Sequence, residues 1–259
     1  MHPNAYTTLA AIEPVGWYYQ ARIRCLHQLI ERFVAPGPAR LEILDVGCGT
    51  GGTSNSLRRF GHVTGLESSP AAIALLKAHY QDLDVVQGEV DDIPVLLGST
   101  SFDLATIMGV LYHRNVTDPA AALRQISHAL TPDGWIVWNE SVYPILARRH
   151  DQFCEAGRRF RPWEMRMLLE AEGFTVRFGS HLLGWGFPIA LALAMLNRAS
   201  KLVIRSHQSD DHVSDDRPLP PFLNAMLREF TYLEFACSLR GLKMPFGVSY
   251  LVIAQKSVR

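Results

Sequence analysis

One short stretch of the chain places a carboxylate directly before a glycine-rich turn. The apolar residues of Leu41–Val46 predict a buried strand, and Asp45 stands near its end. Glycine has no Cβ, so a backbone rich in glycine can turn tightly and approach a ligand closely. Residues 53–60 then predict a helix, which completes the opening of a nucleotide-binding βαβ unit. The turn itself contains Gly47, Gly49, Gly51 and Gly52.

Asp45 indicates which ligand this turn would bind. Residues 47–52 fit the dinucleotide pattern G-x-G-x-x-G, but there the turn faces a pyrophosphate, which a carboxylate would repel. S-adenosylmethionine (SAM) instead presents an ammonium and a sulfonium, which a carboxylate attracts. We therefore predict SAM as the ligand. In the alternative, Asp45 is structural and caps the turn by accepting from backbone N–H groups.

Acidic residues follow the next two predicted strands. The strand at 62–66 ends in Glu67, 18 residues after Gly49. An acid at this distance typically holds a ribose diol, although Glu67 could instead pair with the N-terminus of the helix expected from residue 70. The strand at 85–87 is followed by Glu89 and Val90, where an acid can accept from the adenine amino group.

A histidine follows the fourth predicted strand. That strand ends in Met108, and Gly109 and His113 come next. Because ligands bind at the carboxyl ends of strands in open parallel sheets, we expect all three residues at the site. His113 is the first candidate for a general base near neutral pH, and the alternative is that it only fixes the loop. His150 is a second candidate base, which could equally pair with the neighbouring aspartate on the surface.

An aromatic cluster lies near the start of the helix that we predict at 14–34. It contains Tyr18, Tyr19 and Arg22, and residues 1–13 before it are expected to fray. Aromatic faces attract a sulfonium, and an arginine can pair with the methionyl carboxylate. We therefore predict that this helix covers the cofactor. The alternative is that its aromatic residues only dock it on the sheet.

The second half contains twenty residues, 178–197, without Asp, Glu, Lys or Arg. Such a segment is long enough to span a bilayer, but glycines and Pro188 interrupt it, so we favour a cap or substrate-pocket helix. Its large side chains favour an apolar or amphipathic acceptor. The alternatives are a membrane-surface contact through 181–197, a core segment and a dimer interface. Further along, we expect a mobile loop at 207–221, a helix at 221–239 and a last strand at the sheet edge at 246–254.

Composition sets the outer limits. A chain of 259 residues that is 48% hydrophobic suits a single domain over 1–259. A formal net charge of 0 offers no electrostatic footprint for nucleic acid. The four cysteines lack C-x-x-C pairing and metal-ligand spacing, so we expect free thiols and no metal. We expect no signal peptide and a cytoplasmic protein, either a monomer or a homodimer.

Five segments, in order between residues 41 and 140, together resemble class I SAM-dependent methyltransferases of the broad type 11 group. They are LDVGCGTGG, GLESSP, GEVDDIP, SFDLATIMGVLYH and HALTPDGWIVW. Outside this core the chain resembles one bacterial subgroup, through the aromatic cluster with Arg22, Tyr143-Pro144 and the late series Pro220-Pro221-x-x-Asn224-Ala225. The chain departs from the group at Glu67 and Glu89, where aspartate is common.

The resemblance implies a fold and a reaction. The fold is a Rossmann-like α/β sheet of seven strands, the last antiparallel, with an N-terminal cap helix within 1–38 and a lid or substrate insertion at 181–244. The reaction is methyl transfer from SAM to an O, N or C nucleophile of a small molecule, leaving S-adenosylhomocysteine, with Tyr18 or Tyr19 assisting His113. The implied cofactor-binding residues are Arg22, Asp45, Gly47, Cys48, Gly49, Gly51, Glu67, Ser68, Glu89, Val90, Met108 and Gly109.

Two other function classes stay open. The G-x-G-x-x-G pattern and Glu67 permit an NAD(P)-dependent oxidoreductase, but Asp45 opposes it and the sequence has no Tyr-x-x-x-Lys pair for hydride transfer. A protein of this fold can also keep SAM as a structural ligand, or use it in chemistry without methyl transfer.

Overall fold

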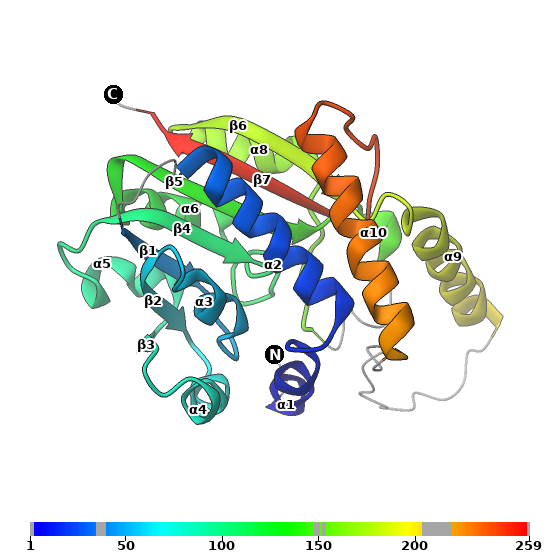
Figure 1. Ribbon diagram of the computed structural model, residues 1–259, viewed down its shortest axis with the longest axis horizontal. Coiled ribbons are helices and arrows are strands. Elements are labelled where there is room, and N and C mark those ends of the chain that lie inside the picture. Colours follow the sequence, from blue (N-terminus) through cyan, green and yellow to red (C-terminus); the bar gives the residue numbers. More distant parts are fainter. Residues whose placement is uncertain (1–2, 35–39, 148–150, 152–153, 204–218, 258–259) are drawn as a thin grey trace.

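A seven-stranded sheet forms the centre of the computed structural model, which describes residues 3–34, 40–147, 151, 154–203 and 219–257 (Figure 1). The strand order is β3-β2-β1-β4-β5-β7-β6. The first five strands pair in parallel, and β7 is antiparallel to both of its neighbours. The strands are β1 (Leu41–Val46), β2 (Gly61–Glu67), β3 (Asp84–Gln87), β4 (Phe102–Met108), β5 (Leu130–Ser141), β6 (Phe174–Leu182) and β7 (Ser249–Lys256).

This sheet confirms the predicted fold class, including the antiparallel last strand. The predicted place of that strand was wrong, because β7 lies between β5 and β6 and β6 forms the edge. Side chains alternate between the faces of a strand, so successive residues of β1 enter different cores. Ile43 packs with the residues of α2, whereas Leu44 and Val46 pack with those of α6.

Helices cover both faces of the sheet (Figure 1). The first core unites the sheet with α2 (Trp17–Leu29), α3 (Gly52–Leu57) and α10 (Pro221–Leu239). The second unites it with η2 (Val90–Asp92), α5 (Ile93–Leu96), α6 (Pro119–Ala129) and α8 (Pro162–Ala171). Asp118 caps α6, since its Oδ1 accepts from the backbone of Ala120 and Ala121 at 3.0 and 3.1 Å. Helix α4 (Pro70–His79) packs against β2 and β3.

The N-terminal region contains two helices where we predicted one. Residues expected to fray form α1 (Pro3–Ile12), which packs against α4. A turn at residues 13–16 leads into α2, which continues as the π-turn η1 (Ile30–Val34). The expectation of fraying was wrong because α1 packs against α4 and buries Ala5 and Tyr6 in the folded chain.

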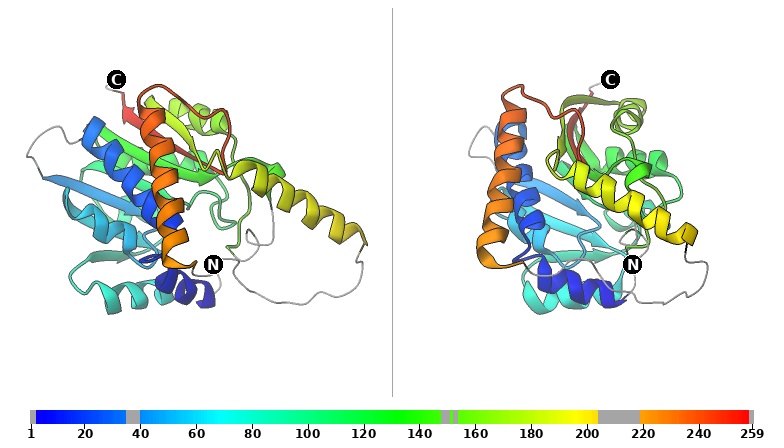
Figure 2. Two further views of the ribbon diagram at one scale, coloured as in Figure 1. Left: turned by 45° about the vertical axis from the view of Figure 1, so that its right-hand side comes forward. Right: turned by 90° about the vertical axis from the view of Figure 1, so that its right-hand side faces the viewer.

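The C-terminal region divides between the sheet and two helices. Strand β6 runs to Leu182, so residues 181 and 182 of the predicted insertion belong to the sheet. Helix α9 (Phe187–Val203) contacts η3 (Pro144–Leu146) and extends outward from the body (Figure 2). Helix α10 instead lies beside α2 across one face of the sheet. Among the described helices, none has the length and hydropathy needed to span a membrane.

Candidate cofactor and acceptor site

A pocket of about 220 Å³ opens at the carboxyl ends of β1, β2, β4 and β5. Most residues that the sequence predicted for the site line this pocket. Gly51 does not, and His150 lies outside the described residues. The predicted residues that line it are Tyr18, Tyr19, Arg22, Asp45, Gly47, Cys48, Gly49, Glu67, Ser68, Glu89, Val90, Met108, Gly109 and His113.

The glycine turn needs glycine at two of these positions. Gly47 and Gly49 have φ values of 66° and 56°, in the left-handed region that side chains with a Cβ disfavour. A Cβ on Gly47 would also lie 2.5 Å from a methyl group of Val110. Gly51 has a different role, because it precedes α3 and a Cβ there would meet Leu76 at 2.8 Å. Its part is therefore packing, outside the pocket.

Glu67 holds the turn in place. Its Oε2 accepts from the backbone N–H of Gly49 and its Oε1 from that of Ser69, both at 2.9 Å. The carboxylate is 6% exposed and borders the pocket. It therefore links the glycine turn to the start of α4, and the remaining lone pairs of its oxygens are available to a ligand.

Asp45 lies beneath the turn, between α3 and β4. Its carboxylate accepts from the hydroxyls of Ser54 and Thr106, the latter at 2.6 Å. The alternative in which Asp45 only caps the turn requires backbone N–H donors, whereas both observed donors are side-chain hydroxyls. Burial raises the pKa of Asp45 to about 6, and the two hydroxyls oppose that rise. At neutral pH the site thus carries a buried negative charge, which suits a cationic ligand.

Arg22 presents a donor to the pocket that no described residue satisfies. Its Nε is buried without a hydrogen-bond partner, while an Nη donates to the carbonyl of Met108 at 3.4 Å. The rings of Tyr18 and Tyr19 lie 5.7 and 5.4 Å from the guanidinium carbon. A buried donor without an acceptor costs free energy. The arrangement therefore fits an anionic group of a ligand, such as the carboxylate of SAM.

The N-terminal residues of the pocket were missed from the sequence. Tyr6 and Leu9 of α1 line it, together with Glu13 from the following turn. Glu13 is 9% exposed and accepts from the hydroxyl of Thr50 at 2.7 Å. Burial raises the pKa of Tyr6 to about 12. The helical spacing of Tyr6, Leu9 and Ile12 was the available signal.

Two titratable groups lie on the acceptor side. His113 stacks on Tyr112 with ring centroids 4.3 Å apart, and burial lowers its pKa to about 4. Glu140, also missed, accepts through Oε1 from the backbone of Val110 and Leu111 at 3.1 and 2.8 Å. Burial raises the pKa of Glu140 to about 7. It thus anchors the loop that carries His113.

The amino-acid sequence is similar to those of known methyltransferases over about half of the chain. Residues 44–138 match the family described as the methyltransferase domain. A ubiquinone biosynthesis O-methyltransferase of Albidiferax ferrireducens is 29% identical over 140 residues, which make up 48% of this chain and 52% of the relative. Its counterpart in Xanthomonas axonopodis is 36% identical over 142 residues, or 51% of this chain and 59% of the relative. The chain thus spans about half the length of the curated relatives it matches.

Solved structures share the architecture over nearly the whole chain. A chain in the Haloferax volcanii complex of a methyltransferase with its Trm112 activator has a TM-score of 0.60 and 19% identity, covering 98% of this chain and 95% of that one. A SAM-dependent methyltransferase from Archaeoglobus fulgidus has a TM-score of 0.53 and 17% identity, covering 92% of each chain. At these identities the likeness is one of fold.

Proposed function

We propose that this chain, whose residues 44–138 match the methyltransferase domain, transfers a methyl group from SAM to an oxygen of a small-molecule acceptor. One observation carries the proposal. Arg22, whose buried Nε has no partner among the described residues, lines the same pocket as the glycine turn and the anionic Asp45. A ligand with both a carboxylate and cationic groups satisfies all three features, and SAM is such a ligand.

Different residues of the pocket would bind different parts of SAM. Arg22 would pair with the methionyl carboxylate, and Glu67 would accept from the ribose diol. Glu89 and Val90 would hold the adenine, and Met108 and Gly109 would lie beneath the reacting end. SAM, when bound, supplies a methyl carbon already activated by its sulfonium. The protein's contribution is therefore orientation and exclusion of water.

An oxygen acceptor must lose a proton, and His113 is the proposed base. Because its pKa is lowered, its imidazole is neutral at physiological pH and can accept a proton. Tyr18 and Tyr19, which line the same pocket, would orient the acceptor hydroxyl. Oxygen is favoured over nitrogen and carbon by the names of the curated relatives, which are O-methyltransferases of ubiquinone biosynthesis.

The acceptor is proposed to be apolar or amphipathic. Helix α9 exposes several large apolar side chains, which would contribute about 25 cal/mol for each Å² of apolar surface that an acceptor covers. Their exposed fractions are 58% for Ile189, 44% for Leu193, 54% for Met195 and 66% for Leu196. A homodimer or a membrane surface would cover the same side chains and is tested below.

Calorimetry with four ligands tests the cofactor. SAM and S-adenosylhomocysteine are expected to bind with dissociation constants in the micromolar range, about −8 kcal/mol, and NAD and NADP much more weakly. Arg22→Ala should weaken SAM binding about tenfold. Transfer of a radiolabelled methyl group to a panel of apolar phenols then tests the reaction. Tighter binding of NAD than of SAM would overturn the proposal.

A further inference from the structure

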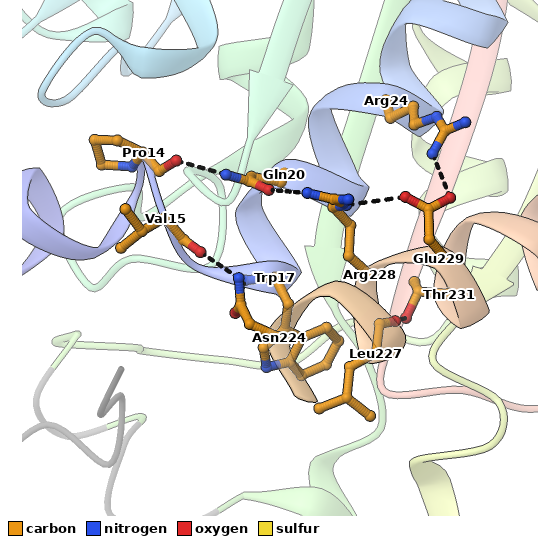
Figure 3. A network of polar contacts seen from close by, with 10 residues as sticks. All are labelled: Pro14, Val15, Trp17, Gln20, Arg24, Asn224, Leu227, Arg228, Glu229 and Thr231. Atoms are coloured by element: carbon orange, nitrogen blue, oxygen red, sulfur yellow. Dashed lines mark hydrogen bonds and ion pairs between the residues drawn. The ribbon is translucent and has the colours of Figure 1, made fainter. Parts of the chain in front are cut away.

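Helix α2 begins without a cap of its own. Its N-cap residue is Gly16, which has no side chain to accept from the first free N–H groups of the helix. The side chain of Asn224, at the start of α10, takes this place (Figure 3). Its Oδ1 accepts from the backbone N–H of Trp17 at 2.8 Å, and its Nδ2 donates to the carbonyl of Val15 at 2.6 Å.

An amide is well suited to this position. Trp17 offers a donor and Val15 an acceptor, and the planar amide of an asparagine or glutamine side chain carries both an acceptor and a donor. The start of α10 sets the position of Asn224, because Pro221 is the first helical residue and the N–H of Asn224 bonds to the carbonyl of Pro220 at 2.9 Å. The Pro-Pro-x-x-Asn series is thus the sequence counterpart of this contact.

The turn held by Asn224 both contains a cofactor-pocket residue and leads into others. Glu13 is its first residue and accepts from Thr50 in the glycine turn. Tyr18 and Arg22 follow it on the first turns of α2. By contrast, no described residue of α10 lines the pocket. The two hydrogen bonds of Asn224 therefore act on the pocket through the backbone of residues 13–17.

We propose that Asn224 is a positioning residue for cofactor binding, which caps α2 from α10 and so fixes the α1–α2 turn over the pocket. This inference rests on the proposed use of SAM. It assigns α10 a role that is separate from any contact with the acceptor. The same helix thereby couples the C-terminal region to the N-terminal cover of the cofactor.

The α2–α10 interface supplies a matched control. Glu229 of α10 accepts from Arg24 of α2 at 2.6 Å, and both side chains are 45% exposed. Glu229 also accepts from Arg228, which donates to Gln20, and Gln20 in turn donates to the carbonyl of Pro14 in the turn (Figure 3). Glu229→Gln keeps a side-chain oxygen that can accept from both arginines. Exposed ion pairs contribute little to stability, so Glu229→Gln should leave the turn intact.

The experiment compares Asn224→Ala, Asn224→Asp and Glu229→Gln in the full chain, using calorimetry with SAM and hydrogen exchange. Asn224→Ala should weaken SAM binding about tenfold and speed exchange at residues 5–17, since it removes both hydrogen bonds. Asn224→Asp keeps an acceptor for Trp17 and should show a smaller loss. Glu229→Gln should change the SAM dissociation constant less than about twofold.

The outcomes separate this inference from the proposed function. If the unaltered protein does not bind SAM, the proposed function fails and this inference fails with it. If the unaltered protein binds SAM and both Asn224 variants bind it equally well, only the positioning role fails. An equal loss in Glu229→Gln would also refute it, because the effect would then belong to the interface as a whole. If Asn224→Ala does not fold, Asn224→Asp decides alone.

Discussion

The two ends of the sheet hold their functional surfaces in different ways. At β1 and β2 the glycine turn is fixed by groups close to it in sequence, such as Glu67 accepting from Gly49 and Ser69. At β6 and β7 the covering helices depend on partners far along the chain, such as Asn224 on Val15 and Trp17. Apolar side chains are buried at the first end, whereas α9 leaves several exposed.

This difference suits two kinds of ligand. The locally fixed turn suits a cofactor that is always the same, and the C-terminal helices suit an acceptor that can differ between proteins. A turn fixed by local hydrogen bonds presents the same geometry whatever the rest of the chain does. The exposed side chains of α9 named above do not line the pocket, so they can be altered without disturbing that turn. We infer that the cofactor end determines the reaction and that the C-terminal end determines the acceptor, and three changes test this division.

The largest effect is expected at Gly47. Gly47→Ala places a Cβ at a φ of 66° and 2.5 Å from Val110, so SAM affinity should fall by more than tenfold. Gly98→Ala is the matched control, since its φ is 56° but its Cβ meets nothing within 4 Å. Gly98→Ala should lower the free energy of unfolding by the cost of left-handed backbone strain, about 1–2 kcal/mol. Its SAM affinity should stay unchanged. Equal SAM affinity in the two variants, measured by calorimetry, would contradict a locally fixed turn.

A smaller effect is expected on stability at the C-terminal end. Trp185 packs between Trp17 and Phe230, with ring centroids 5.7 and 5.9 Å away, and its Nε1 donates to Thr231. Trp185→Ala should therefore lower the melting temperature by about 5 °C, from a loss of about 2 kcal/mol. The 66% exposed Leu196 should tolerate alanine within about 2 °C.

Leu196→Ala also tests what covers α9. If the acceptor does, the KM for the acceptor should rise while the SAM dissociation constant stays constant. Conversion of a dimer to a monomer, measured by light scattering, would assign the surface to a second copy. Loss of binding to phospholipid vesicles would assign it to a membrane. Either result would contradict the proposal that the acceptor covers the exposed side chains of α9.

The smallest expected effect is the pH dependence of kcat, which depends on His113 and Glu140 between the two ends of the sheet. A base must be neutral to act, so activity is lost as pH falls through the pKa of His113, which burial lowers to about 4. The kcat at saturating SAM should therefore be flat from about pH 8 to about pH 5.5. A limb near pH 7 that disappears in Glu140→Gln would instead assign the proton transfer to Glu140, whose pKa is about 7. Circular dichroism at each pH would confirm that the protein stays folded.

The cofactor end could be predicted from sequence because its signals are local. A strand, a glycine turn and Glu67 lie within 27 residues between Leu41 and Glu67, and each has a preferred backbone geometry. The structure places these residues around one pocket. What each of them binds stays a prediction.

The features that were missed depend on tertiary contacts. Helix α1 is stabilised by packing against α4, a contact that the spacing of its apolar residues does not identify. The segment HALTPDGWIVW ends at Trp138, whereas β5 continues to Ser141, so Glu140 was not recognised as a buried anchor. Asn224 stood in a recognised series, but its two backbone partners are more than 200 residues away. Such pairings have no periodic signal in one sequence.

The position of β7 has a consequence for how the chain is made. Strand β6 pairs with the rest of the sheet only through β7, which is synthesised about 70 residues later. A nascent chain that has left the ribosome as far as β6 can assemble the parallel strands, but β6 must wait for its neighbour. Contacts this distant in sequence form slowly. The apolar residues of β6 are thus exposed to chaperones and to aggregation until residues 249–256 emerge and insert.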